Sequence, residues 1–69
     1  MKKILIINEA TGQIVAYTTI TGLESDWGLT DKELIEARIQ YAIDDEVLEE
    51  NVWYQYYETK RVPKGLLLI

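Results

Sequence analysis

The sequence predicts a small α+β fold in which a single helix packs on one face of a small antiparallel sheet. Three observations support this prediction: two segments rich in β-branched residues around a glycine turn, one amphipathic segment with a helix-start signal, and a late segment dense in aromatic residues. A chain of 69 residues has room for one hydrophobic core. We therefore expect a single domain, residues 1–69, built from a β-hairpin, one helix and one or two C-terminal strands.

The hairpin is expected from strands at Lys3–Asn8 and Gln13–Thr21, because both segments are rich in β-branched residues. Between them lies Glu-Ala-Thr-Gly, in which Gly12 is the expected left-handed residue that lets the chain reverse. Two sets of side chains alternate along the second strand: Ile14, Ala16, Thr18 and Ile20 on one side, and Val15, Tyr17 and Thr19 on the other. The alternation predicts that one set faces the core, and it does not decide which.

The helix is predicted to begin after Thr30 and to end near Asp44–Asp45. Thr30-Asp-Lys-Glu33 fits a capping box, in which the Thr30 hydroxyl accepts from the Glu33 amide and the Glu33 carboxylate accepts from the Thr30 amide. One apolar stripe follows at helical spacing: Ile35, Ile39, Ala42 and Ile43. Glu46 would fall on this stripe if the helix continued, so the helix is expected to end near Asp44–Asp45, with a loose further turn to Glu50 as the alternative.

The segment Asn51–Glu58 holds four of the seven aromatic residues. Residues Val52–Thr59 are either a continuation of the helix or a strand, and their aromatic and β-branched density favours the strand. A strand would have two sides: Val52, Tyr54 and Tyr56 on one, and Trp53, Gln55 and Tyr57 on the other. Since one helix covers one face of a sheet, rings on the other face are exposed or lie against another molecule. The alternative is that the loop 22–28 and the C-terminal tail cover them.

The end of the sequence, Gly65-Leu-Leu-Leu-Ile69, is too apolar to remain in water. It is expected either to add a strand to its own sheet or to pair with a second chain. Pairing between chains predicts a homodimer through Leu66–Ile69, through Val52–Glu58, or through both segments.

The residues needed for most chemistry are missing. The chain has no Cys and no His and only one serine, Ser25, which excludes the usual nucleophile–base pairs, disulfides and zinc sites. No phosphate-binding glycine motif is present, and the acids around Asp44–Glu46 lack the spacing of a calcium loop. We expect no catalytic residue, no cofactor and no dedicated metal site.

The absence of Cys fits a reducing compartment. The N-terminal apolar run, Ile4–Ile7, is too short for an export signal, and no run approaches the length of a membrane span. We expect a soluble, cytoplasmic protein with no membrane partner.

The net charge of −5 is concentrated in the middle of the chain, because residues 24–50 hold ten carboxylates against two cations. Such a segment repels nucleic acid phosphates and attracts basic surfaces, so direct nucleic acid binding is not expected. The plainer interpretation is that these acids only keep the protein in solution.

These patterns favour a non-enzymatic protein-binding module with a basic, nucleic-acid-binding protein surface as its partner. The residues predicted to bind are acids and rings: Glu24, Asp26, Trp27, Glu33, Glu36, Trp53 and Tyr57. The competing hypothesis is a self-associating assembly subunit with no separate target. In size, acidity and element order the chain resembles small phage-encoded inhibitors of host enzymes, including uracil-DNA glycosylase inhibitors. That likeness is one of type, and it carries over no residue.

Overall fold

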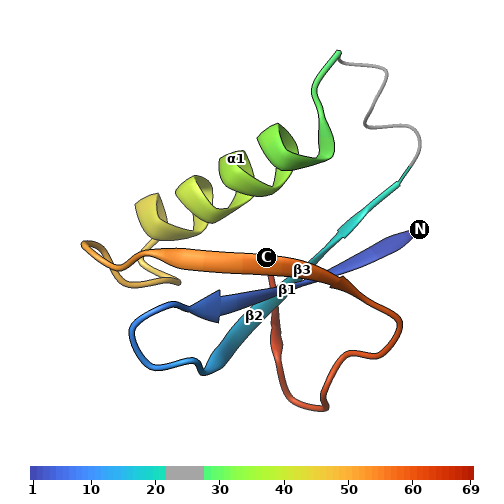
Figure 1. The fold of residues 1–69 in the computed structure, drawn as a ribbon. Helices are drawn as coiled ribbons and strands as arrows, with labels where there is room; N and C mark the ends of the chain where they lie inside the picture. Colours follow the sequence, from blue (N-terminus) through green and yellow to red (C-terminus); the bar gives the residue numbers. More distant parts are fainter. Residues whose placement is uncertain (22–27) are drawn as a thin grey trace.

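The computed structural model describes residues 1–21 and 28–69 and confirms the α+β fold: one helix packed on a four-stranded sheet (Figure 1). The elements are β1 (Lys2–Asn8), β2 (Ile14–Ile20), α1 (Asp31–Asp44), β3 (Tyr54–Thr59) and β4 (Leu67–Leu68). The order across the sheet is β3-β1-β2-β4. β1 is antiparallel to both of its neighbours, whereas β4 runs parallel to β2, so the sheet is mostly antiparallel but mixed.

The hairpin between β1 and β2 forms where the sequence predicts it. Gly12 has a φ of 72°, and its N–H donates to the carbonyl of Asn8 at 2.8 Å. The Asn8 side chain also accepts a hydrogen bond from the Ala10 amide at 2.9 Å. These local bonds fix the turn, because glycine adopts a positive φ without the steric penalty of a Cβ.

The pairing of β1 with β2 decides which side chains meet the helix. Ala16 and Thr18 lie opposite Ile6 and Ile4, and all four side chains are buried. A register shift between Ile6 and Ile7 interrupts the alternation at the start of β2. For this reason Val15, which strict alternation assigns to the other set, packs against the same core.

Both ends of α1 follow from its local sequence. At the N-terminus, Thr30 and Glu33 form both bonds of the predicted capping box. At the C-terminus, the Val47 N–H donates to the Ala42 carbonyl at 2.8 Å and the Glu46 N–H to the Ile43 carbonyl at 3.0 Å. This is a Schellman motif, with Glu46 at the left-handed position at a φ of 62° instead of the usual glycine.

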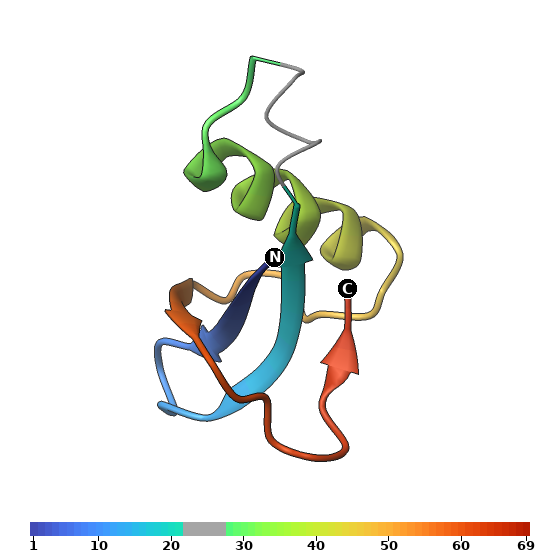
Figure 2. The ribbon, with the colours of Figure 1, turned by 90° about the vertical axis from the view of Figure 1, so that its right-hand side faces the viewer.

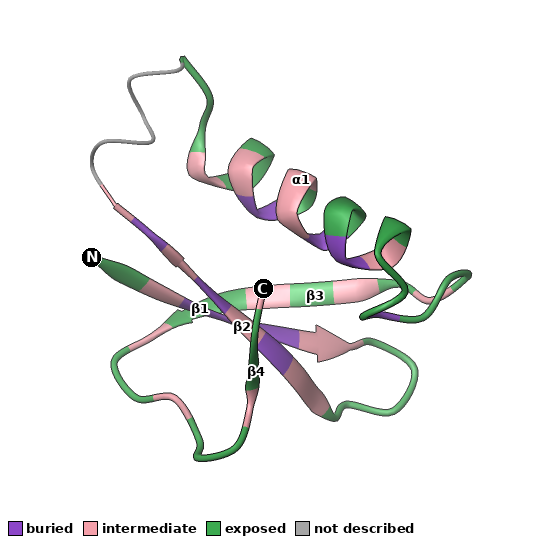
Figure 3. Ribbon diagram, turned by 180° about the vertical axis from the view of Figure 1, so that it is seen from behind, coloured by how far each residue is buried: buried purple, intermediate pink, exposed green. Residues whose placement is uncertain are grey.

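The helix packs more closely against β2 than against β3. Small residues permit this approach, since Ala16 and Thr18 on β2 have no exposed surface. The Thr18 hydroxyl accepts a hydrogen bond from Arg38 Nη1 at 2.8 Å, which satisfies the buried oxygen. Figure 3 shows the buried positions of α1 on its sheet side, with exposed positions on its outer side.

The chain leaves β3, crosses the sheet over residues 60–66, and returns as β4 at the opposite edge. In Figure 2 this segment passes in front of the sheet, while α1 lies behind it. The face opposite the helix carries a row of side chains that share a register position: Tyr57, Leu5, Tyr17 and Leu68. Leu5 is buried within this row, whereas Tyr57 and Leu68 at its two ends are exposed.

Candidate functional site

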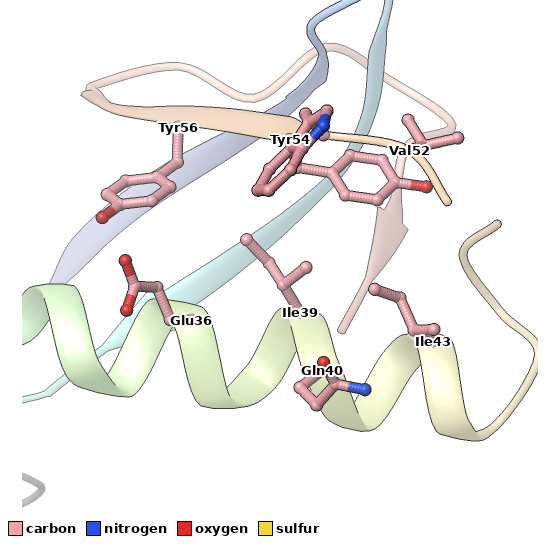
Figure 4. Close-up of a pocket in the computed structure, with 8 residues that line it drawn as sticks. Glu36, Ile39, Gln40, Ile43, Val52, Tyr54 and Tyr56 are labelled. Atoms are coloured by element: carbon pink, nitrogen blue, oxygen red, sulfur yellow. The ribbon is translucent and has the colours of Figure 1, made fainter. Parts of the chain in front are cut away.

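A groove runs between the helix and the edge strand β3. Its lining, which defines the α1–β3 groove, consists of Glu36, Ile39, Gln40, Ile43, Val52, Trp53, Tyr54 and Tyr56. Figure 4 shows Tyr56 directed from β3 toward Glu36, the Tyr54 ring extending along the groove toward Val52, and Glu36 and Ile39 directed from the helix toward β3. The groove measures about 280 Å³ and is open to solvent. Pockets for small molecules are usually enclosed and roughly 300–1,000 Å³, so its shape suits side chains of a protein partner better.

The groove exists because the helix approaches β2 and leaves a wider space above β3. Tyr54 and Tyr56 are large enough to span part of this space, and both are half-buried and packed against the core. The Tyr54 hydroxyl donates to the Glu49 carbonyl at 3.1 Å, which holds this ring at one end of the groove. Trp53, by contrast, is 80% exposed.

The electrostatic character of the groove is acidic. Glu36 is the charged residue in its lining, and no described Lys or Arg lines it. The adjoining surface beyond Ile43 is lined by Glu46, Glu49 and Glu50, again without a described cation. A basic side chain entering the groove would therefore be attracted by Glu36 and by the acids of the adjoining surface, and no described cation in the lining would repel it.

Lys2, which belongs to β1, is already paired. Its Nζ lies 2.5 Å from the Asp31 carboxylate at the start of α1. The hydrogen bond to Asp31, followed by charge attraction to the same group, raises the pKa of the Lys2 ammonium above its ordinary value. This pair links β1 to the N-terminus of the helix.

The residues predicted to bind are separated by the fold. Glu36 and Trp53 both line the α1–β3 groove. Glu33 is exposed, but its carboxylate accepts hydrogen bonds from the Thr30 amide and hydroxyl in the capping box. Tyr57 is 47% exposed and pairs with Leu5, which places it on the face opposite the helix. The remaining predicted residues, Glu24, Asp26 and Trp27, lie outside the described residues, as does most of the loop 22–28.

The residues predicted to bind did not include six of the eight that line the groove: Ile39, Gln40, Ile43, Val52, Tyr54 and Tyr56. The helical spacing of Glu36 with Ile39, Gln40 and Ile43 was a usable signal, because residues three, four and seven apart share a helix face. Tyr56 also stood on the predicted face of Val52 and Tyr54. What the sequence lacked was the relative placement of the helix and β3.

A second hollow, the α1–β4 hollow, lies at the opposite edge of the sheet and measures about 340 Å³. Its lining includes four exposed large apolar residues: Tyr41, Val47, Leu67 and Leu68. It also includes one cation, Arg38, and one anion, Asp45, so its charges are balanced. The predicted C-terminal strand thus joins its own sheet, since β4 pairs with β2, and still presents apolar surface.

Among the described residues, no three acidic side chains gather closely enough to hold a metal ion. No helix in the described ranges has the length and apolar character needed to cross a membrane. Comparison with protein-family models, with curated proteins and with solved structures finds no match for this chain.

Proposed function

We propose that this protein is a small, acidic, non-enzymatic binding module that holds a basic protein surface in its α1–β3 groove. The observation that carries the proposal is that Glu36 and the largely exposed Trp53 line one groove whose described lining has no cation. Trp and Tyr are enriched at interface hot spots, because they give a large contact area for little lost rotamer freedom. The acids would set the rate of encounter, and the rings would supply most of the affinity.

The preferred partner class is a nucleic-acid-binding protein, because its basic groove is complementary to clustered carboxylates. A protein of this kind would act as an inhibitor or regulator by occupying that groove, as phage-encoded inhibitors do. A cytoplasmic location belongs to the same proposal.

The test is affinity capture from a cytoplasmic extract, followed by titration of the captured partner against variants. Glu36→Lys and Trp53→Ala should each weaken binding about tenfold or more, since central interface residues contribute roughly 2 kcal/mol when truncated. The matched controls are Asp45→Lys, which makes the same charge change outside the groove, and Tyr57→Ala, which removes a ring from the opposite face. Equal losses in the control variants, or unchanged binding by Glu36→Lys, would contradict the proposal.

A second candidate function, self-association, is favoured by the α1–β4 hollow. Four exposed apolar side chains with balanced charge suit a second copy of the chain, because an acidic or basic partner finds no net charge to match there. The resulting homodimer would use the segment Leu66–Ile69. Tyr41, which is 68% exposed, can be changed to Ser with little risk to the core. Sedimentation should show a dimer that Tyr41→Ser dissociates, and a monomer at all concentrations rejects this function.

A further inference from the structure

The strand β3 has one side that no described strand covers, because it stands at the edge of the sheet. Two backbone hydrogen bonds show which residues of β3 bond to β1 and which point outward. The Glu9 N–H donates to the Trp53 carbonyl at 2.9 Å, whereas the Asn8 N–H points the other way, to Gln13. Because such bonds alternate along an antiparallel pair, Gln55, Tyr57 and Thr59 bond to β1. The N–H and C=O groups of three other residues therefore point outward: Tyr54, Tyr56 and Glu58.

This edge lacks several of the usual protections against pairing, and Glu58 is the one charged residue in the strand. Within Tyr54–Thr59 there is no proline and no lysine, and the pairing with β1 continues through all six residues without a bulge. The same edge borders the α1–β3 groove, since Tyr54 and Tyr56 line it. Any strand added to β3 would send alternate side chains into the space beside α1 (Figure 4).

The spacing of the groove matches such a strand. Alternate residues of a strand are about 6.6–6.8 Å apart, and a helix rises about 4.5 Å over the three residues from Glu36 to Ile39 and about 10.5 Å over the seven from Glu36 to Ile43. A side chain opposite Tyr56 would lie near Glu36, and the next one on the same side, opposite Tyr54, would fall between Ile39 and Ile43. Figure 4 shows this correspondence, with Tyr56 above Glu36 and Tyr54 above Ile39.

We infer that the α1–β3 groove binds an extended basic segment of a partner protein as a fifth strand on β3. One Arg or Lys of that segment pairs with Glu36, and an apolar residue two positions away packs on Ile39 and Ile43. This inference rests on the proposed function and specifies its mode, in which backbone bonds supply affinity and alternate side chains supply selectivity.

The charges of the groove favour a basic segment of a partner protein over a second copy of this chain as the strand added to β3. Two copies paired through β3 about a two-fold axis at Tyr56 would direct their Glu36 side chains toward each other, which is unfavourable. A basic segment meets Glu36 and then the acids that line the adjoining surface, Glu46, Glu49 and Glu50. The groove is therefore better matched to a cationic strand than to itself.

The test uses a short synthetic peptide with Arg and Leu at alternate positions and threonine elsewhere, titrated into the whole protein and followed by calorimetry. A series of peptides, each methylated on one backbone nitrogen, distinguishes strand addition from simple docking. Strand addition predicts that methylation weakens binding at least tenfold at every second position and little at the positions between them. Uniform sensitivity, or none, overturns the inference.

Two protein variants test the same edge. Glu58→Pro removes an outward N–H without removing a bond to β1, and Glu58→Ala is its control for the lost carboxylate. Only Glu58→Pro should weaken binding of the peptide, by at least fivefold. An unchanged circular dichroism spectrum would show that this variant keeps the fold. Equal binding by the two variants contradicts strand addition.

Charge exchange separates this inference from the proposed function. Glu36→Lys should lose the Arg peptide and bind a Glu-for-Arg peptide instead. If the Arg peptide binds through Glu36 but shows no alternating effect of methylation, the binding module stands and the fifth strand is rejected. If no Arg peptide binds although a captured partner does, the extended segment is again rejected. Peptide binding that splits a dimer in sedimentation would identify the second copy as the natural occupant and overturn the inference.

Discussion

The two sides of the helix contrast in how they meet the sheet. Toward β2, the small residues Ala16 and Thr18 let α1 approach closely, and the contact is fully buried. Toward β3, Tyr54 and Tyr56 are only half-buried and line an open groove. The difference shows that side-chain size across one sheet face places the helix off-centre. The groove is therefore a consequence of core packing, and it can be altered by changing residues that no partner touches.

The largest effect on stability should come from overpacking the buried contact between α1 and β2. Ala16→Leu inserts a large side chain where no exposed surface remains, so we expect a loss of about 1–3 kcal/mol of unfolding free energy. The measurement is urea denaturation. Ala10→Leu is the matched control, because Ala10 is exposed in the hairpin turn and its change should stay within about 0.5 kcal/mol. Similar losses at the two positions would show that the contact with β2 is not tightly packed.

The second largest loss of stability should come from removing the hydrogen bond between Thr18 and Arg38, which lies on the same side of the helix. Thr18→Val keeps the shape of the side chain but removes the oxygen that accepts from Arg38, so we expect a loss of about 1–2 kcal/mol. A double-mutant cycle with Arg38→Met measures the coupling between the two residues by denaturation. Thr19→Val serves as a control, since its contact with Arg38 uses the backbone carbonyl, which the change retains. Additive effects of Thr18→Val and Arg38→Met would contradict this account.

A substitution at the C-terminal end of the helix should stabilise the fold, in contrast to the two destabilising changes at the contact with β2. Glu46 holds a left-handed conformation in which glycine is free of steric penalty, so Glu46→Gly should stabilise the fold by about 0.5–1 kcal/mol. Asn51→Gly is the matched control at a φ of 61°, and its gain should be smaller because asparagine tolerates this region. Thermal denaturation measures both. A loss of stability in Glu46→Gly would mean that the Glu46 side chain contributes more than its backbone strain removes.

The smallest effect should come from the exposed pair at the start of the helix. Asp31 raises the pKa of Lys2 in the folded protein, so the pair stabilises the fold below the ordinary pKa of lysine, and this contribution is lost as pH rises through the raised value. Asp31→Asn should lower the Lys2 pKa, as measured by NMR titration of its side chain. An unchanged Lys2 pKa would contradict the pairing.

Much of the fold was predictable because its signals are local. The capping box of Thr30 and Glu33, the left-handed Gly12 and the end of α1 at Asp44 each depend on neighbours within a few residues. The strand at Tyr54–Thr59 followed from aromatic density, which favoured it over a continued helix. The candidate site was predicted less completely. Of the residues predicted to bind, Glu36 and Trp53 line the α1–β3 groove, whereas Tyr57 lies on the opposite face of the sheet.

The sequence by itself determined where the helix and the hairpin begin and end, because capping and turn chemistry act over three or four residues. It also determined the acidic middle and the absence of the side chains on which nucleophile–base pairs and zinc sites depend. Only the tertiary structure decided which face of β2 meets the helix, that β4 runs parallel, and that Glu36 faces Tyr56. Those outcomes depend on contacts between residues far apart in the chain, whose geometry is set when all the elements pack together.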